Sequence, residues 1–170
     1  DLWNNRELRT SQMELVEVQA DRYVVRLSTS VRPEPATVYF TPQWQPCRTM
    51  QNSDKAVCTG SLKFPMQVGD KHTYEKLPWN NGNGHSTASC EVKGEEKLTL
   101  AAGTFDTVRV ECSGFWNRVY GGTFSGKQSE VAWYAPAISR VVKNEFTNYD
   151  AGGKLDVRER SELVEFAAKP

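Results

Sequence analysis

The sequence has few of the residue types on which metal sites and catalytic sites depend. It contains only two histidines in 170 residues, and its four cysteines include no Cys-x-x-Cys pair. Structural zinc sites usually combine such closely spaced cysteines with histidine, so no metal ion is expected. The sequence also lacks a Gly-x-Ser-x-Gly motif and a calcium-loop pattern. We therefore predict a protein that is not an enzyme and that needs no cofactor.

The chain has no excess of charge of either sign. Lys and Arg together number 21, Asp and Glu also number 21, and the formal net charge at pH 7 is zero. A balanced chain has no electrostatic basis for binding nucleic acid or an anionic membrane surface. No segment approaches the roughly 20 apolar residues of a membrane-spanning helix. We therefore expect neither a nucleic-acid partner nor a transmembrane segment.

Long runs of helix-forming residues are absent, and short alternating segments take their place. Apolar residues are 38% of the chain and aromatic residues 11%, a balance that suits a β-rich domain with a modest core. Period-two alternation between turn signals predicts roughly nine to eleven short strands. We therefore predict an all-β fold, an antiparallel meander that forms a curved sheet or an open half barrel, with little helix.

The clearest strand signal lies in residues 98–111. Val108 and Val110 alternate with Arg109 and Glu111, which is the pattern of a half-buried strand. Gly103 suits the left-handed position of a three-residue hairpin loop. We therefore predict one long hairpin, with strands at residues 86–100 and 105–116, and with a bulge or kink at Gly94. Other strands are expected in a hairpin at residues 10–29 and at residues 72–76, 130–134, 138–148 and 155–166, the last in preference to a short helix.

Prolines and glycines predict the main loops. Residues 31–46 contain four prolines, which remove ladder donors, so we expect a loop there around one short edge strand at Val38–Phe40. Residues 78–84 contain two Asn-Gly pairs and are expected to form a long hairpin tip. The length suits one domain over residues 1–170. Its first part, residues 1–62, is expected to hold the hairpin and the proline-rich loop, and residues 63–170 the meander.

Four cysteines without a metal motif indicate disulfides, which form in oxidising compartments. Of the three possible pairings we favour Cys47–Cys58 and Cys90–Cys112, because each closes a short local loop. If Leu100 lies opposite Thr104 in the long hairpin, Cys90 and Cys112 are diagonal neighbours, and a bulge at Gly94 would shorten their separation. The disulfides predict a periplasmic or extracellular location.

The start of the chain bears on the same question. Residues 1–4, Asp-Leu-Trp-Asn, have neither the basic start nor the apolar run of a signal peptide. Export would therefore require that the signal was removed or that the chain is an excised domain.

Candidate binding residues are aromatic and polar side chains in the expected loops. Trp79 lies between Pro78 and Asn80 and is expected to be exposed, whereas Trp116 and Trp133 are expected to be core residues on neighbouring strands. Two isolated histidines do not make a catalytic triad, so His85 is expected to be solvated. The candidates for contact with a ligand or partner are Trp44, Trp79, Asn80, Asn81, Asn83 and His85.

An ordered series of short motifs spans the last two thirds of the chain. They are Phe-Pro-x-x-x-Gly-Asp at residues 64–70, residues 102–111, Trp-Tyr-Ala-Pro at 133–136, residues 140–145 and Glu-Leu-Val at 162–164. This series resembles a bacterial domain-of-unknown-function family of exported β proteins, over about residues 64–166. Ala101 and Ala137 depart from the proline and glycine usual there. The resemblance implies an envelope location and a curved antiparallel sheet or open barrel, and it brings no catalytic residues.

Three functions are compatible with these features. The first is a non-catalytic, exported bacterial envelope domain that binds or scaffolds a partner such as an envelope protein. The second is a carrier of a hydrophobic small molecule in a half barrel, as in lipoprotein-carrier or lipocalin-like folds. The third is a carbohydrate-binding module that uses loop aromatics to bind a glycan. A dry apolar cavity would favour the carrier, a flat row of exposed aromatics the glycan module, and a filled core the first function.

Overall fold

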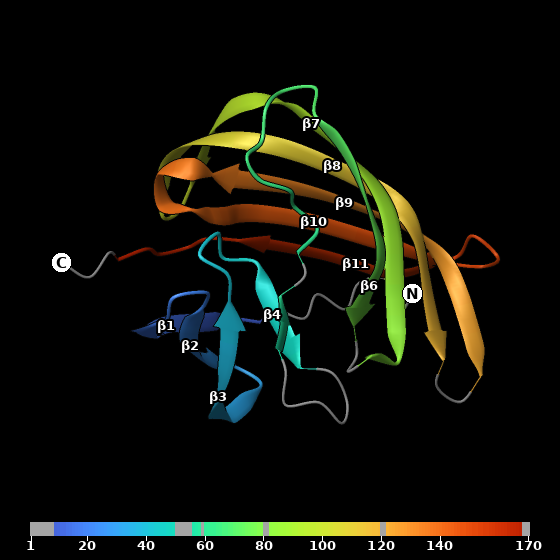
Figure 1. Cartoon of the computed structure of the whole chain (residues 1–170), viewed down its shortest axis with the longest axis horizontal. Coiled ribbons are helices and arrows are strands. Elements are labelled where there is room, and N and C mark those ends of the chain that lie inside the picture. Colours follow the sequence, from blue (N-terminus) through green and yellow to red (C-terminus); the bar gives the residue numbers. More distant parts are fainter. Residues whose placement is uncertain (1–8, 50–55, 59, 80–81, 120–121, 168–170) are drawn as a thin grey trace.

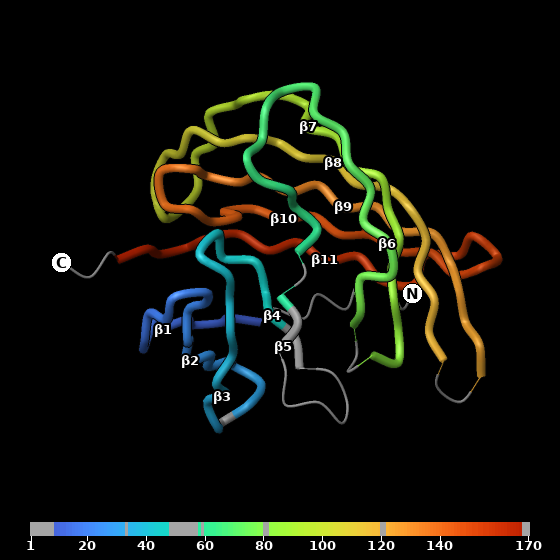
Figure 2. The backbone as a smooth tube through the Cα atoms, viewed as in Figure 1, coloured from blue at the N-terminus to red at the C-terminus, as the bar shows by residue number. Residues whose placement is uncertain are grey.

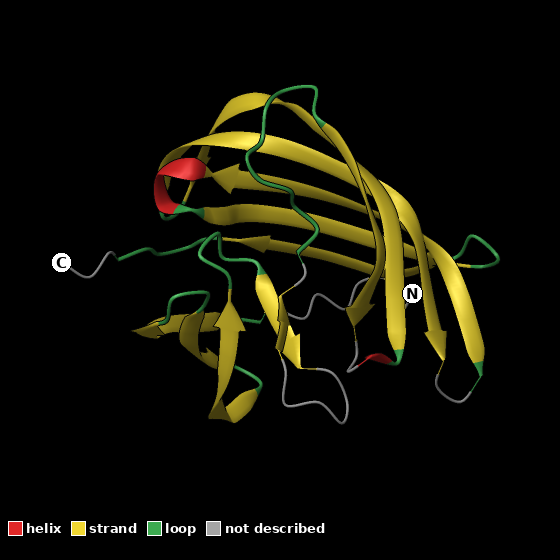
Figure 3. Ribbon diagram, in the orientation of Figure 1, coloured by secondary structure: helices red, strands yellow, loops and turns green. Residues whose placement is uncertain are grey.

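A computed structural model describes residues 9–49, 56–58, 60–79, 82–119 and 122–167. The described strands form two antiparallel sheets that do not close into a barrel (Figure 1). Most of the described residues belong to strands. The turn between the ninth and tenth strands is a short 3₁₀ helix, η3 (Pro136–Ile138) (Figure 3). The predicted all-β fold with an open, curved sheet is confirmed.

The smaller sheet is built from the first third of the chain. Its strands are β1 (Ser11–Val18), β2 (Tyr23–Thr29), β3 (Arg32–Phe40), β4 (Pro46–Thr49) and β5 (Ala56–Cys58), and they follow one another in that spatial order. Val25 of β2 is fully buried, and it lies opposite Leu15 on one side and Val38 on the other. The sheet thus has one apolar face, called here the inner face.

The larger sheet is a six-stranded meander. Its strands are β6 (Lys71–Trp79), β7 (Gly84–Leu100), β8 (Gly103–Val119), β9 (Thr123–Ala135), β10 (Arg140–Asp150) and β11 (Leu155–Glu162), each paired with its neighbours in sequence. Strands β7 and β8 are both 17 residues long. In Figure 1 the sheet arches over the smaller one.

The main core lies on one face of the central strands. Ala88, Cys90 and Val92 of β7 are buried there beside Val110 and Cys112 of β8, as period-two alternation requires. Partly buried apolar side chains pack against this face, namely Leu62, Met66 and Tyr74. Leu62 and Met66 belong to the connecting segment, residues 60–70, which joins the two sheets and runs across the large sheet in Figure 2.

Hydrogen bonds hold this connecting segment in place. The buried side chain of Gln45 donates to the carbonyl of Leu62 at 2.6 Å and accepts from its backbone N–H at 3.2 Å. The ring of His72 lies 2.8 Å from the carbonyl of Ser61, so β6 is linked to the same segment. The segment therefore connects the edge of one sheet to the covered face of the other.

A second buried cluster lies near the end of β9. Trp133, Ala135 and Val142 form it, with partly buried apolar side chains around them. Both Trp116 and Trp133 are buried, on the neighbouring strands β8 and β9. The prediction that these two tryptophans are core residues is confirmed.

The proline-rich segment differs from its prediction. Instead of a loop around a short edge strand, residues 32–40 form the nine-residue strand β3 in the interior of the smaller sheet. Its register with β2 shifts between Leu27 and Thr29, opposite the proline-bearing half of β3. The prolines are accommodated beside this irregularity, where the regular ladder is interrupted. The last expected strand is confirmed as the edge strand β11.

The long hairpin is confirmed, but its turn is tighter than predicted. Leu100 lies opposite Gly103, so two residues form the turn, and Gly103 has a φ of +132°. The ladder register shifts between Val92 and Gly94, where the bulge was expected. The tighter turn and the bulge together move Cys90 directly opposite Cys112.

Both predicted disulfides are present. Cys47–Cys58 joins directly opposite residues of β4 and β5, and Cys90–Cys112 joins directly opposite residues of β7 and β8. They differ in exposure, because Cys58 is exposed whereas both partners of the second bridge are buried in the main core.

Candidate functional site

The aromatic end of the large sheet is the region where β6 and β8 end and β7 and β9 begin. The pairing register brings the ends of these strands together, because Trp79 pairs with Gly84, Gly84 with Arg118, and Arg118 with Phe124. The aromatic end contains Trp79, Ser86, Trp116, Arg118, Phe124 and Gln128. The side chains of Ser86, Trp116 and Gln128 are buried.

Trp79 and Trp116 are in edge-to-face contact at the aromatic end. Their ring centroids are 6.3 Å apart and their planes are inclined by 68°. A Cβ on Gly84 would lie 2.4 Å from the ring of Trp79, so glycine makes room for this ring. The indole nitrogen of Trp116 donates to the carbonyl of Tyr149 at 3.1 Å. The two rings are therefore parts of the packed sheet.

A polar network lies beside these rings. The Ser86 hydroxyl donates to the side-chain oxygen of Gln128 at 2.9 Å, and the Gln128 amide donates to the Tyr74 hydroxyl at 3.0 Å. Glu130 lies on the next inward position of β9 and accepts from Asn144 at 2.6 Å. Burial, and then the charge of Glu130, raise the pKa of Tyr74 to about 12, although the hydrogen bond from Gln128 acts in the opposite direction.

The raised pKa of Tyr74 predicts a loss of stability at high pH. The unfolded chain releases this proton near pH 10, whereas the folded chain retains it to about pH 12, so stability falls as pH rises through this interval. Tyr74→Phe should remove most of this dependence, and Tyr149→Phe serves as a control on the same sheet. Urea unfolding between pH 9 and pH 12 measures it. Equal pH slopes in the wild type and Tyr74→Phe would contradict the assignment.

Three of the six predicted binding residues lie at this end. Trp79 is the last residue of β6 and is half-buried, so the expected exposed loop at Pro78–Trp79 is instead strand. The carbonyl of Asn83 accepts from the backbone N–H of Val119 at 2.8 Å. His85 is half-buried and pairs with Pro78 and Asn117. Asn80 and Asn81 lie outside the described residues.

Trp44, the sixth predicted residue, is at the opposite end of the large sheet. It packs against Tyr23 and Phe40, and the guanidinium of Arg140 lies 3.8 Å from its ring centroid. Burial lowers the pKa of Arg140. Arg140 pairs with Ala135 at the end of β9, whereas Trp116 pairs with Gly126 near its start. Trp44 therefore contributes to the contact between the sheets and does not join Trp79 in one site.

The β8–β9 hairpin carries exposed apolar side chains that the sequence analysis did not select. Phe115, Val119 and Phe124 are 59%, 63% and 45% exposed. Phe124 lies beside the guanidinium of Arg118, which is 5.0 Å from its ring centroid. Their positions in alternating strand segments were visible in the sequence, but either face of a strand could have been the buried one. Phe115 and Val119 lie on one face of β8, whereas Phe124 pairs with Arg118 and therefore lies on the opposite face. We call Phe115 and Val119 the hairpin patch.

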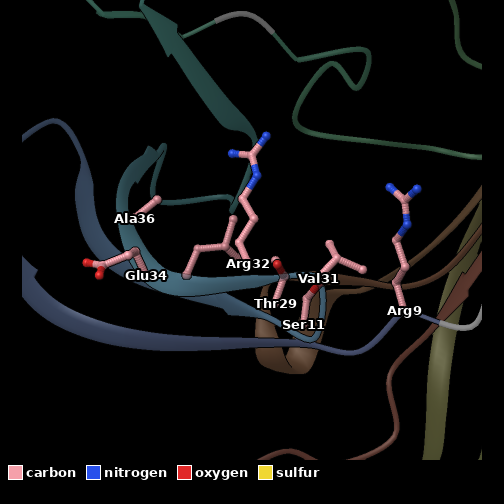
Figure 4. A pocket seen from close by; sticks show the side chains of 8 residues that line it. Arg9, Ser11, Thr29, Val31, Arg32, Glu34 and Ala36 are labelled. Carbon is pink, nitrogen blue, oxygen red and sulfur yellow. The ribbon is translucent and has the colours of Figure 1, made fainter.

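Two hollows among the described residues are open and are lined by charged and polar as well as apolar side chains. The larger, of about 610 Å³, crosses β6–β9 and is lined by residues that include Lys71, Ser89, Glu111 and Ser129. The smaller, of about 240 Å³, lies at the start of β1, and Figure 4 shows Arg9 and Arg32 extending to the same side there. Neither is the dry apolar cavity that a lipid carrier would need.

The described residues hold neither a metal-binding cluster nor a membrane-spanning helix. No group of three or more His, Cys, Asp or Glu side chains in the described ranges could hold a metal ion. None of the helical segments in the described part of the chain is long and apolar enough to cross a membrane.

Comparison with known proteins gave no relative. No family model, curated protein or solved structure matches the chain. Function must therefore be inferred from the chain itself.

Proposed function

We propose that this chain is a non-catalytic, exported bacterial β domain that binds a protein partner at the cell envelope. The observation that carries the proposal is the filled interior. Ala88, Val92 and Val110 are almost completely buried where Leu62 and Met66 pack against them, so the apolar side chains of that face are covered by the protein itself. Binding is then left to the outer surfaces. The two disulfides are compatible with export, and the motif series at residues 64–166 supports an envelope location.

The hairpin patch is the partner-contacting surface in this proposal. Large apolar side chains that remain exposed on one face are typical of protein interaction sites. Phe115 and Val119 would bury their side chains against the partner from the same face of β8. Trp79 supports the same end of the sheet through its contact with Trp116.

Co-purification from a bacterial envelope extract tests the patch. We expect the double variant Phe115→Ser/Val119→Ser to recover its partner with at least tenfold lower yield than the wild type. Val68→Ser/Val164→Ser is the matched control, because these valines are 58% and 66% exposed elsewhere on the chain. Equal recovery by the wild type and the Phe115→Ser/Val119→Ser variant would contradict the site. Equal loss in both double variants would show nonspecific apolar adhesion.

A further inference from the structure

The outer edge of β1 differs from the other sheet edges among the described strands. β5 is only three residues long, and β11 is dominated by charged side chains. β6 contains Pro78 and a register irregularity between Tyr74 and Leu77. Short length, charge, proline and irregularity all protect an edge from pairing with another chain. β1 is eight residues long, contains neither proline nor a basic residue, and ends the smaller sheet in Figure 1. Its register irregularity lies between Leu15 and Glu17, so Ser11–Leu15 pair regularly with β2.

The apolar inner face of the smaller sheet continues onto this edge and is only partly covered there, because the Arg140 guanidinium donates to the Met13 sulfur at 3.3 Å. Met13, Leu15 and Val18 lie opposite Leu27, Val25 and Tyr23, so they belong to the inner face. Met13 is 39% exposed, Leu15 37% and Val18 64%, whereas Val25 in the next strand is fully buried. One added strand with apolar side chains on the inner side would complete the burial of this face.

The backbone of β1 is also oriented to accept a strand. The N–H of Ser30 donates to the carbonyl of Thr10 at 2.9 Å, so Thr10 faces β2. Because hydrogen-bonding direction alternates along an antiparallel strand, the N–H and carbonyl groups of Ser11, Met13 and Leu15 point to the outer edge. No described strand pairs with that edge.

The charges of β1 select the occupant. Glu14 and Glu17 lie opposite Arg26 and Val24, on the face opposite Val25. Glu14 pairs with Arg26 at 3.0 Å, while the Glu17 carboxylate accepts a hydrogen bond from Gln19 at 3.2 Å and has no cationic partner within the described ranges. A second copy of β1 would bring further glutamates and no basic residue, which is unfavourable opposite like charges. A strand with basic outward residues would be attracted.

We propose that β1 accepts an added β-strand from a protein partner whose extended segment alternates apolar residues with lysine or arginine. The apolar residues cover Met13, Leu15 and Val18 on the inner face, and the basic residues lie beside Glu17 and Glu14. This surface is separate from the hairpin patch, so either can fail without the other.

Hydrogen exchange of the full chain with short peptides tests the proposal. A capped seven-residue peptide alternating valine and lysine is expected to slow exchange of the Met13 and Leu15 amides at least tenfold, without changing the Glu14 amide, which already faces β2. The same peptide with glutamate in place of lysine is expected to have little effect. Glu17→Lys, a substitution at an exposed position, should reduce the effect of the lysine peptide and increase that of the glutamate peptide.

Three outcomes would overturn the proposal. One is equal protection by the lysine and glutamate peptides. Another is protection of amides outside β1 without protection of Met13 and Leu15. The third is a dimer, detected by light scattering, in which these two amides are already protected without peptide, because the occupant would then be a second copy. The co-purification result for the hairpin-patch variant is independent of these three outcomes, because the hairpin patch and the β1 edge are different surfaces.

Discussion

Gly126→Ala is expected to lower the free energy of unfolding by about 3 kcal/mol, because the added methyl group would have to displace backbone. A Cβ at this buried position would lie 1.8 Å from the carbonyl oxygen of Tyr149 and 2.8 Å from the indole nitrogen of Trp116. These two atoms form the hydrogen bond that joins β8 to β10 across β9. The substitution would therefore separate β9 from β10 and break that bond.

The matched control for this prediction is Gly94→Ala. A Cβ at Gly94 would meet nothing within 4 Å, and the residue has no left-handed φ. We expect a change of less than about 1 kcal/mol. Urea unfolding followed by tryptophan fluorescence measures both variants. Equal effects of the two substitutions would mean that Gly126 does not lie under the Tyr149 carbonyl.

Removal of the Cys90–Cys112 disulfide is expected to produce the second large effect. The bridge spans 22 residues, and a loop of that size contributes about 3 kcal/mol through the entropy of the unfolded chain. Both cysteines are also buried in the main core, at 3% and 5% exposure, so Cys90→Ala/Cys112→Ala loses packing as well. The double variant should unfold at a clearly lower urea concentration than the wild type.

The Cys47–Cys58 disulfide serves as the control for removal of the Cys90–Cys112 disulfide. Cys47→Ala/Cys58→Ala removes a bridge that spans 11 residues and has an exposed partner, so the loss of stability should be smaller. Mild reductant without denaturant should also open Cys47–Cys58 first, which alkylation and peptide mass analysis would detect. Preferential alkylation of Cys90 and Cys112 would contradict the burial of their bridge.

Local chemistry made much of the fold predictable. Period-two alternation at Val108 and Val110 identified the central strand, and Gly94 marked the ladder irregularity beside it. Cysteine number and spacing predicted both disulfides. The register was harder to predict, because a turn shortened by one residue shifts every pair in the ladder. Only the paired strands show that Leu100 lies opposite Gly103.

The candidate site was less predictable than the fold. Pro78–Trp79 has the composition of a loop, yet pairing with His85 and Gly84 makes it the end of β6. Trp44 and Trp79 were selected for the same chemistry, but they pack at opposite ends of the large sheet. Composition carries no information about which distant strand ends meet. Exposure of Phe115 likewise depends on which face of β8 the connecting segment covers.

The sequence by itself therefore determined the class of fold, the two disulfides and the buried tryptophans of β8 and β9, because alternation, cysteine count and aromatic burial act through local spacing. Only the tertiary structure decided that residues 32–40 are an interior strand, that Cys90 faces Cys112, and that Met13 and Leu15 remain partly exposed at a sheet edge. These features depend on strand register and on what packs against each face. Both arise from contacts between residues far apart in the chain.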